Sequence, residues 1–148
     1  ADPLAPISTP SPDSPPSRAG TTVLHYEVRE PLGAGGMGIV HRARDTRLDR
    51  PVALKFVGPS LLPDADARRR LLREARAASS LDDPHVCTVY GVEETADGDV
   101  CIAMALCGGG TLLDRIRRGS LPVGEAVDVA TQIARGLAHA HARGLVPR

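Results

Sequence analysis

A glycine-rich run at residues 33–38 is the feature that most limits how this chain can fold. The run reads Gly-Ala-Gly-Gly-Met-Gly, and after Ile39 and Val40 small or apolar residues alternate with basic ones. Such alternation is typical of a β-strand, and residues 23–28 before the glycines also indicate one. We therefore predict a strand, a glycine turn and a second strand. A dinucleotide-binding fold would need a helix directly after the glycines and an acid about 20 residues further on, where this chain has Ala53 and Leu54.

Lys55 is the only lysine in a chain that has seventeen arginines, and it ends the strand-like run Val-Ala-Leu-Lys at residues 52–55. A glycine backbone can approach phosphates closely because it has no Cβ, and its N–H groups can point at the anion. Lysine adds a compact, mobile charge that the planar guanidinium of arginine does not replace. The glycine run and Lys55 together favour a site for a nucleoside triphosphate. For the run alone, a purely structural turn remains the alternative.

The remaining pattern predicts a small mixed fold. We expect strands at residues 52–57, 86–92 and 100–106, and helices at 64–79, 112–117 and 123–143. The first three strands are joined by short connections, so the fold class is α+β with a five-stranded antiparallel sheet. Asp64 is the expected N-cap of the first helix. Glu74 shares a face of that helix with Leu71 and Ala75, which turns an acid towards the sheet; a solvated glutamate at the edge of the stripe is the alternative.

The chain has 148 residues, enough for one domain of ordinary size. Residues 1–21 are rich in proline and serine, and we expect them to form a disordered tail. The ordered part divides into a first lobe at residues 22–107 and the start of a second lobe at 108–148. The apolar stripe of the helix at 123–143 needs a partner, and without one we expect a dimer or swapped oligomer through this helix.

Composition excludes several functional classes. Acidic and basic residues balance at 18 each, which argues against nucleic acid or an anionic membrane as a partner. The three cysteines, Cys87, Cys101 and Cys107, lack any C-x-x-C spacing, so we expect neither a disulfide framework nor a zinc site, and a reducing cytoplasm fits best. No apolar run approaches the length of a membrane-spanning helix.

Six residues follow one another in the order of the protein-kinase small-lobe signature: Gly33, Gly35, Gly38, Val40, Lys55 and Glu74. Through them the chain resembles bacterial serine/threonine protein kinases of the eukaryotic-like family. The resemblance covers residues 24–146 and continues in Asp-Pro-His-Val at 83–86 and in Gln-Ile-Ala-Arg-Gly-Leu from residue 132.

The resemblance implies that ATP and Mg²⁺ are the cofactors. It assigns nucleotide contacts to Leu32, Gly33, Gly35, Gly36, Gly38, Val40, Ala53, Lys55, Met104, Ala105 and Cys107. Lys55 would hold the α- and β-phosphates while pairing with Glu74, which makes these two the catalytic residues of the chain. Met104 matches the gatekeeper position, and residues 105–107 match the hinge, whose backbone would hydrogen-bond the adenine. The family often has an acid where Ala105 stands.

The motifs that complete phosphoryl transfer do not occur in this sequence. In the family, H-R-D-x-K-x-x-N and D-F-G orient the substrate hydroxyl and hold Mg²⁺. The chain ends in Leu-Val-Pro-Arg at 145–148, which matches the remnant of a thrombin-cleaved tag. Either the chain is truncated there or Pro147 is native, and we prefer truncation. We therefore expect the ATP-binding part of a kinase that phosphorylates protein hydroxyls, inactive by itself; the alternative is a pseudokinase-type or isolated-lobe regulatory module.

Overall fold

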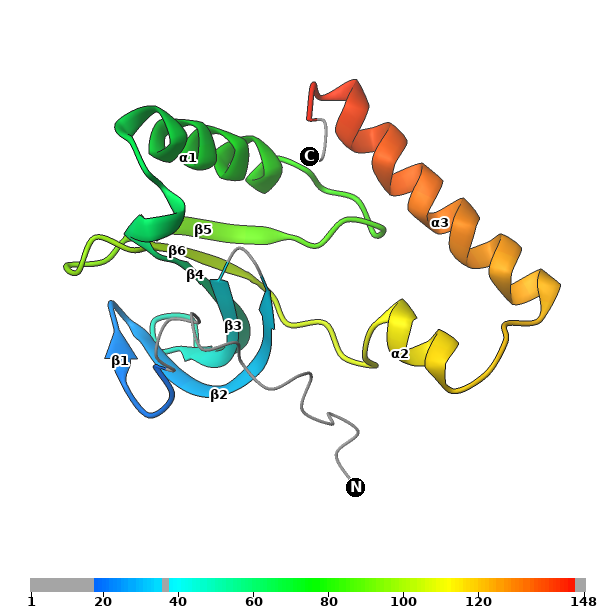
Figure 1. Ribbon diagram of the computed structural model, residues 1–148, viewed down its shortest axis with the longest axis horizontal. Helices are drawn as coiled ribbons and strands as arrows, with labels where there is room; N and C mark the ends of the chain where they lie inside the picture. The colour runs from blue at the N-terminus through cyan, green and yellow to red at the C-terminus, as the bar shows by residue number, and fades with distance from the viewer. Residues whose placement is uncertain (1–17, 36–37, 146–148) are drawn as a thin grey trace.

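Six strands form one antiparallel sheet in the described part of the chain, residues 18–35 and 38–145 of the computed structural model (Figure 1). Their spatial order is β1-β2-β3-β4-β6-β5. The strands are β1 Thr22–Val23, β2 Tyr26–Gly35, β3 Gly38–Asp45, β4 Arg50–Val57, β5 Val89–Glu94 and β6 Val100–Ala105. The helices are η1 Pro59–Leu61, α1 Ala65–Ser79, α2 Leu112–Arg117 and α3 Val123–Ala142. The predicted α+β fold is thus confirmed.

The sheet has one strand more than the five predicted, because the first predicted strand is two strands. The chain reverses after Val23, and Leu24 has a φ of 56°. β1 then pairs with β2, with Thr22 opposite Glu27 and Val23 opposite Tyr26. Positive φ is uncommon for a residue other than glycine, so the sequence carried no turn signal at Leu24.

β5 also begins later than predicted, at Val89 rather than at residue 86. The Asp83 carboxylate accepts a hydrogen bond from the backbone N–H of His85 at 2.8 Å, and the Asp83 carbonyl accepts one from Val86 at 3.1 Å. These hydrogen bonds form an aspartate-capped turn. They occupy backbone N–H groups that would pair with a neighbouring strand if β5 began at residue 86.

The two faces of the sheet carry separate hydrophobic clusters. One cluster joins Tyr26 and Val28 of β2 to Leu54 and Phe56 of β4. The other lies on the opposite face, where α1 packs with Ala75 buried and Leu71 and Leu72 partly buried. In Figure 1, α1 lies along the β5 side of the sheet, while β1 and β2 curl away beneath β3 and β4. The sheet is therefore a curled layer with a core on each side.

The predicted bounds of the helices are close to those observed. Asp64 is the N-cap of α1, and its carboxylate accepts a hydrogen bond from the Ala67 N–H at 2.7 Å. Thr111 caps α2 through a reciprocal pair of hydrogen bonds with Asp114. These residue patterns stabilise a helix end by satisfying N–H groups that have no partner within the helix.

α3 contacts the loop between α1 and β5, and its Glu125 forms an ion pair with Arg115 of α2. Its Gly136 lies against His85, and Arg143 donates a hydrogen bond to the Ser80 carbonyl at 3.3 Å. Four of its large apolar side chains are nevertheless exposed, namely Val123, Val127, Ile133 and Leu137. No helix within residues 18–35 and 38–145 is long and apolar enough to cross a membrane.

Most of the expected tail and the last three residues of the chain lie outside the described residues, as does Gly36. The last residues of that tail are bound to the sheet: the Gly20 N–H donates to the Val28 carbonyl, and the Val28 N–H donates to the Thr21 carbonyl, each at 2.9 Å. Ordered structure therefore begins at least four residues before the predicted start at Thr22. The predicted boundary between the two lobes, at residue 107, stays a prediction.

Candidate functional site

One face of the sheet brings together several of the predicted nucleotide contacts. Val40 of β3 lies opposite Gly33 of β2 and opposite Lys55 of β4. Residues paired across antiparallel strands present their side chains on the same face, so these three form a row across three strands. Ala53 lies on this face too, two residues before Lys55, and it pairs with Met104 of β6.

This arrangement follows from the alternation of residues along β4. Val52, Leu54 and Phe56 are buried in the cluster with β2, so Ala53 and Lys55 must point to the other face. Lys55 is half-buried, and Val40 and Met104 are half-buried beside it. The face thus combines a charge with apolar neighbours. Leu32 is half-buried as well and lies at an irregularity in the β2–β3 pairing next to Gly33.

The predicted ion pair between Lys55 and Glu74 is not formed in this structure. Among the described residues no carboxylate lies within ion-pair distance of Lys55, and Glu74 is exposed. The inner face of α1 is taken by Ala75, Leu71 and Leu72, whose burial orients the helix. The solvated glutamate that the sequence left open as an alternative is therefore what the structure shows, and the catalytic role of Glu74 stays a prediction.

Gly38 is required by the packing of the sheet. Its φ is +114°, and a Cβ at this position would overlap the carbonyl oxygen of Phe56 in β4. It pairs with Gly35 at the end of the β2–β3 hairpin, which confirms the predicted strand–turn–strand arrangement. The structure therefore gives a packing reason for glycine at this position, and its contact with phosphate stays a prediction.

The predicted hinge leaves β6 at Ala105. The Ala105 N–H donates to the Thr88 carbonyl at 2.9 Å, which continues the β5–β6 pairing. The Ala105 carbonyl accepts hydrogen bonds from the thiols of Cys87 and Cys107, with sulfur–oxygen distances of 3.6 and 3.9 Å. Cys107 is exposed. The N–H and carbonyl groups of Ala105, in the predicted hinge, are thus already hydrogen-bonded within the protein. The sequence did not predict these contacts.

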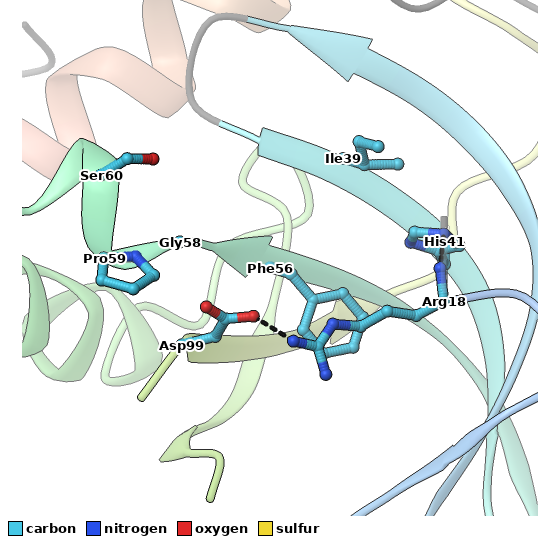
Figure 2. A pocket seen from close by; sticks show the side chains of 8 residues that line it. All are labelled: Arg18, Ile39, His41, Phe56, Gly58, Pro59, Ser60 and Asp99. Atoms are coloured by element: carbon cyan, nitrogen blue, oxygen red, sulfur yellow. Dashed lines mark hydrogen bonds and ion pairs between the residues drawn. The ribbon is translucent and has the colours of Figure 1, made fainter. Parts of the chain in front are cut away.

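A cavity of about 210 Å³ lies on the opposite face of the sheet, against Ile39, His41 and Phe56 (Figure 2). Arg18 lies across it: the guanidinium forms an ion pair with Asp99 and lies 5.1 Å from the centroid of the Phe56 ring. The backbone N–H of Arg18 donates to Nε2 of His41 at 3.3 Å. Burial, and secondarily Arg18, lowers the pKa of His41 below its ordinary value.

Sequence reasoning missed this cavity because Arg18 belongs to the proline- and serine-rich segment. Nothing in the sequence distinguishes Arg18 from the proline- and serine-rich residues around it. The charge of Arg18 is already balanced by Asp97 and Asp99, at the turn between β5 and β6. We therefore regard the contact as structural. It lies on the face of the sheet opposite to Lys55 and is separate from the candidate nucleotide site.

The residues on this face of the sheet fit ATP. The glycine turn, Lys55 and the apolar side chains around it suit phosphates and a base on one face. Within residues 18–35 and 38–145, no three His, Cys, Asp or Glu side chains gather as metal ligands would.

The sequence matches the family described as protein kinase domain over residues 26–148. It is 41% identical to the serine/threonine-protein kinase PknE of Mycobacterium tuberculosis, over 89% of this chain and 23% of that protein. It is 35% identical to the serine/threonine-protein kinase pkn2 of Myxococcus xanthus, over 83% of this chain and 15% of that protein. The chain thus spans less than a quarter of these relatives.

Comparison with solved structures also finds a protein kinase domain. The crystal structure of the Mycobacterium tuberculosis PknI kinase domain superimposes with a TM-score of 0.78 at 33% identity. The match covers 88% of this chain and 54% of that one. The chain therefore corresponds to about half of that solved kinase domain.

Proposed function

Because this chain belongs to the protein kinase domain family, we propose that it is the ATP-binding part of a serine/threonine protein kinase. The family match confirms the resemblance that the glycine–lysine signature predicted. The observation that carries the proposal is the row formed by Gly33, Val40 and Lys55, with Ala53 and Met104 beside it. A phosphate chain and an adenine ring need such a combination of backbone, charge and apolar surface.

Each residue of this face has a physical task in the proposal. The ammonium of Lys55 offsets the negative charge of the α- and β-phosphates, and Gly33 and Gly35 let the backbone approach them. Val40, Ala53 and Met104 exclude water from the faces of the adenine, and residues 105–107 hydrogen-bond its edge. Bound ATP supplies the γ-phosphoryl group that the whole kinase passes to a protein hydroxyl, with Mg²⁺ held by residues elsewhere in that kinase.

Glu74 belongs to the proposal as the residue that orients Lys55. It would do so after a movement or rotation of α1, because its side chain is exposed in this structure. The absence of the pair here is also the observation that favours the second candidate, a regulatory module without catalysis. In either case we expect the 148-residue chain alone not to transfer phosphate, since it lacks the H-R-D and D-F-G motifs. We place its action in the cytoplasm, where ATP is available.

Calorimetry with Mg-ATP tests the proposal directly. Saturable binding should weaken about tenfold or more in Lys55→Met, because the charge-assisted contacts with phosphate are lost. Arg42→Met is the matched control: Arg42 lies on the same face, opposite Ala53, but pairs with Glu30 at 2.8 Å. Its affinity for ATP should stay close to that of the unaltered chain.

Two results would overturn the proposal. One is equal loss of binding in both variants, which would mean that ATP responds only to the general charge of the surface. The other is no saturable binding by the unaltered chain.

Glu74→Gln separates the two candidates, because a kinase-like site should lose affinity or orientation of the phosphates, whereas a module that never forms the pair should not change.

We also propose that the chain associates with itself through α3. The exposed apolar side chains of this helix support the proposal, since Val123 is 80% exposed and Val127 57% exposed. Burying them against a second copy would remove apolar surface from water.

A further inference from the structure

Two of the three cysteines lie at the open end of the β5–β6 hairpin. Cys87 comes two residues before β5, and Cys107 comes two residues after β6. Beyond the pair Val89 and Met104, the hydrogen bond from the Ala105 N–H to the Thr88 carbonyl continues the ladder at 2.9 Å. Antiparallel pairing therefore brings the segment before residue 88 alongside the segment after residue 105.

The two thiols share one hydrogen-bond acceptor. Both lie within hydrogen-bond distance of the Ala105 carbonyl oxygen, at 3.6 Å for Cys87 and 3.9 Å for Cys107. In addition to desolvation, the Cys107 thiol is near enough to raise the pKa of Cys87. Two cysteines held this close, on segments fixed by a sheet, need little movement to become bonded.

The pair is accessible from solvent. Cys87 and Cys107 are both exposed, and both line a cavity of about 370 Å³ that Gln132 and Ile133 of α3 also line. A small oxidant can therefore reach the sulfur atoms. Exposed, adjacent thiols are the kind that react in proteins, whereas buried ones are inert.

We propose that Cys87 and Cys107 form a peroxide-sensitive dithiol that closes reversibly into an intramolecular disulfide. The Cys107 thiolate attacks one oxygen of hydrogen peroxide, the O–O bond breaks, and Cys107 becomes a sulfenic acid. The hydroxide released takes up the proton that Cys107 lost and leaves as water. The Cys87 thiol then attacks the Cys107 sulfur, the S–O bond breaks, and the S–S bond forms with loss of a second water. Two electrons pass from the sulfurs to the peroxide.

The order of attack follows from the surroundings of Cys87. Although Cys87 is exposed as a residue, partial desolvation of its thiol, together with the neighbouring Cys107, raises its pKa, so Cys87 suits the second, resolving step. Cys101 serves as a control within the same chain. It is 1% exposed in the core of the sheet, and burial raises its pKa to about 12, so it should not react.

Closure would tie the exit of β6 to the loop that contacts α3, and so would fix the backbone of residues 105–107. Such transient disulfides are the kind expected in a reducing compartment, where permanent ones are rare. The bond does not depend on nucleotide binding, so the two proposals can fail separately.

Thiol counting and peptide mapping test the inference. The reduced chain is treated with hydrogen peroxide, blocked with an alkylating reagent and digested without reductant. Chymotrypsin cleaves after Tyr90 and Leu106 and so separates the three cysteines. We expect loss of two of the three thiols, a cross-linked peptide containing Cys87 and Cys107, and full recovery with dithiothreitol. Cys101→Ala should form the same link.

Single variants distinguish the two roles. In Cys87→Ser, a sulfenic acid should persist at Cys107 and be trapped by dimedone; in Cys107→Ser, Cys87 should remain largely reduced. The inference is overturned if both thiols survive the peroxide treatment, if the link joins Cys101, or if only disulfides between separate chains appear at low protein concentration. Circular dichroism of each variant verifies that it is folded.

Discussion

At the residue scale, Gly38 has no acceptable substitute in this backbone. Its φ of +114° is costly for a residue with a side chain, and an added Cβ would overlap the Phe56 carbonyl oxygen. We expect Gly38→Ala to lower the free energy of unfolding by about 3 kcal/mol. Urea denaturation measures this loss without any ligand.

Gly91→Ala is the matched control for Gly38→Ala. Gly91 is also a strand glycine, but no atom lies within 4 Å of the position that its Cβ would occupy. Its unfolding free energy should change by less than about 1 kcal/mol. If both variants were equally stable, the requirement for glycine at residue 38 would belong to ligand binding alone.

His41 links a single buried side chain to the pH dependence of stability. It is 1% exposed, and burial followed by Arg18 lowers its pKa below 6.5. The unfolded chain therefore binds a proton near pH 6.5 that the folded chain does not, so the contribution of His41 to stability is present above that pH and is lost as the pH falls through it. In His41→Gln, urea denaturation at about pH 7 and about pH 5 should show a smaller difference than in the unaltered chain.

His141→Gln provides the comparison for His41. His141 is exposed on α3, so His141→Gln measures the effect of removing a histidine from the surface. If the difference in unfolding free energy between the two pH values were unchanged in His41→Gln, other groups, such as the buried Asp45, would dominate the loss of stability in acid. Hydrogen bonds from Leu48 and Arg47, with His25 and Arg50, lower the pKa of that carboxyl although burial alone would raise it.

At the element scale, the docking of α3 depends on the absence of a side chain at Gly136. A Cβ there would lie 2.8 Å from the carbonyl oxygen of His85, which belongs to the loop before β5. Gly136→Ala should therefore separate α3 from this loop, although alanine favours the helix itself. Hydrogen exchange should show weaker protection of the backbone amides of α3. The contact between the side chains of His139 and Asp83, which is 3.5 Å in this structure, should be lost with it.

Gly124→Ala tests the same substitution on the same helix without the contact. No atom lies within 4 Å of a Cβ at Gly124. Alanine should stabilise α3 there by up to about 1 kcal/mol, through helix propensity alone. Equal protection of α3 in the two variants would show that the helix is held by contacts other than the one at His85.

At the scale of the whole molecule, the two sides of α3 have different surroundings. Gly136 and Ala140 are buried against the rest of the chain, while Val127 and Ile133 are 57% and 48% exposed. We expect the apparent mass by light scattering to rise above the 15.5 kDa of one chain as concentration increases. Val127→Glu combined with Ile133→Glu should keep the chain at that mass, because charges oppose burial of the stripe.

Arg135→Glu is the control for this double variant, since Arg135 lies on the polar side of α3. It should associate as the unaltered chain does. A chain that stays at the mass of one copy at every concentration would contradict self-association through α3.

Some features of this protein follow from its sequence because their causes are local. The hairpin at the glycines is indicated by alternation within about ten residues, and α1 begins at Asp64 because the cap and the N–H groups it serves are neighbours. The family followed from residues in a recognisable order, from Gly33 to Glu74, which does not depend on how they meet in space.

Other features were decided only by contacts between distant parts of the chain. The side of α1 that faces the sheet was set by burial of Leu71, Leu72 and Ala75, and this left Glu74 in solvent although its spacing allowed either orientation. Arg18 is held against the sheet because its guanidinium meets the Asp99 carboxylate and the Phe56 ring, both of which are distant from it in the sequence. Local pattern determines which elements form; the tertiary structure decides which of their side chains meet, because burial is shared among elements that the sequence does not place together.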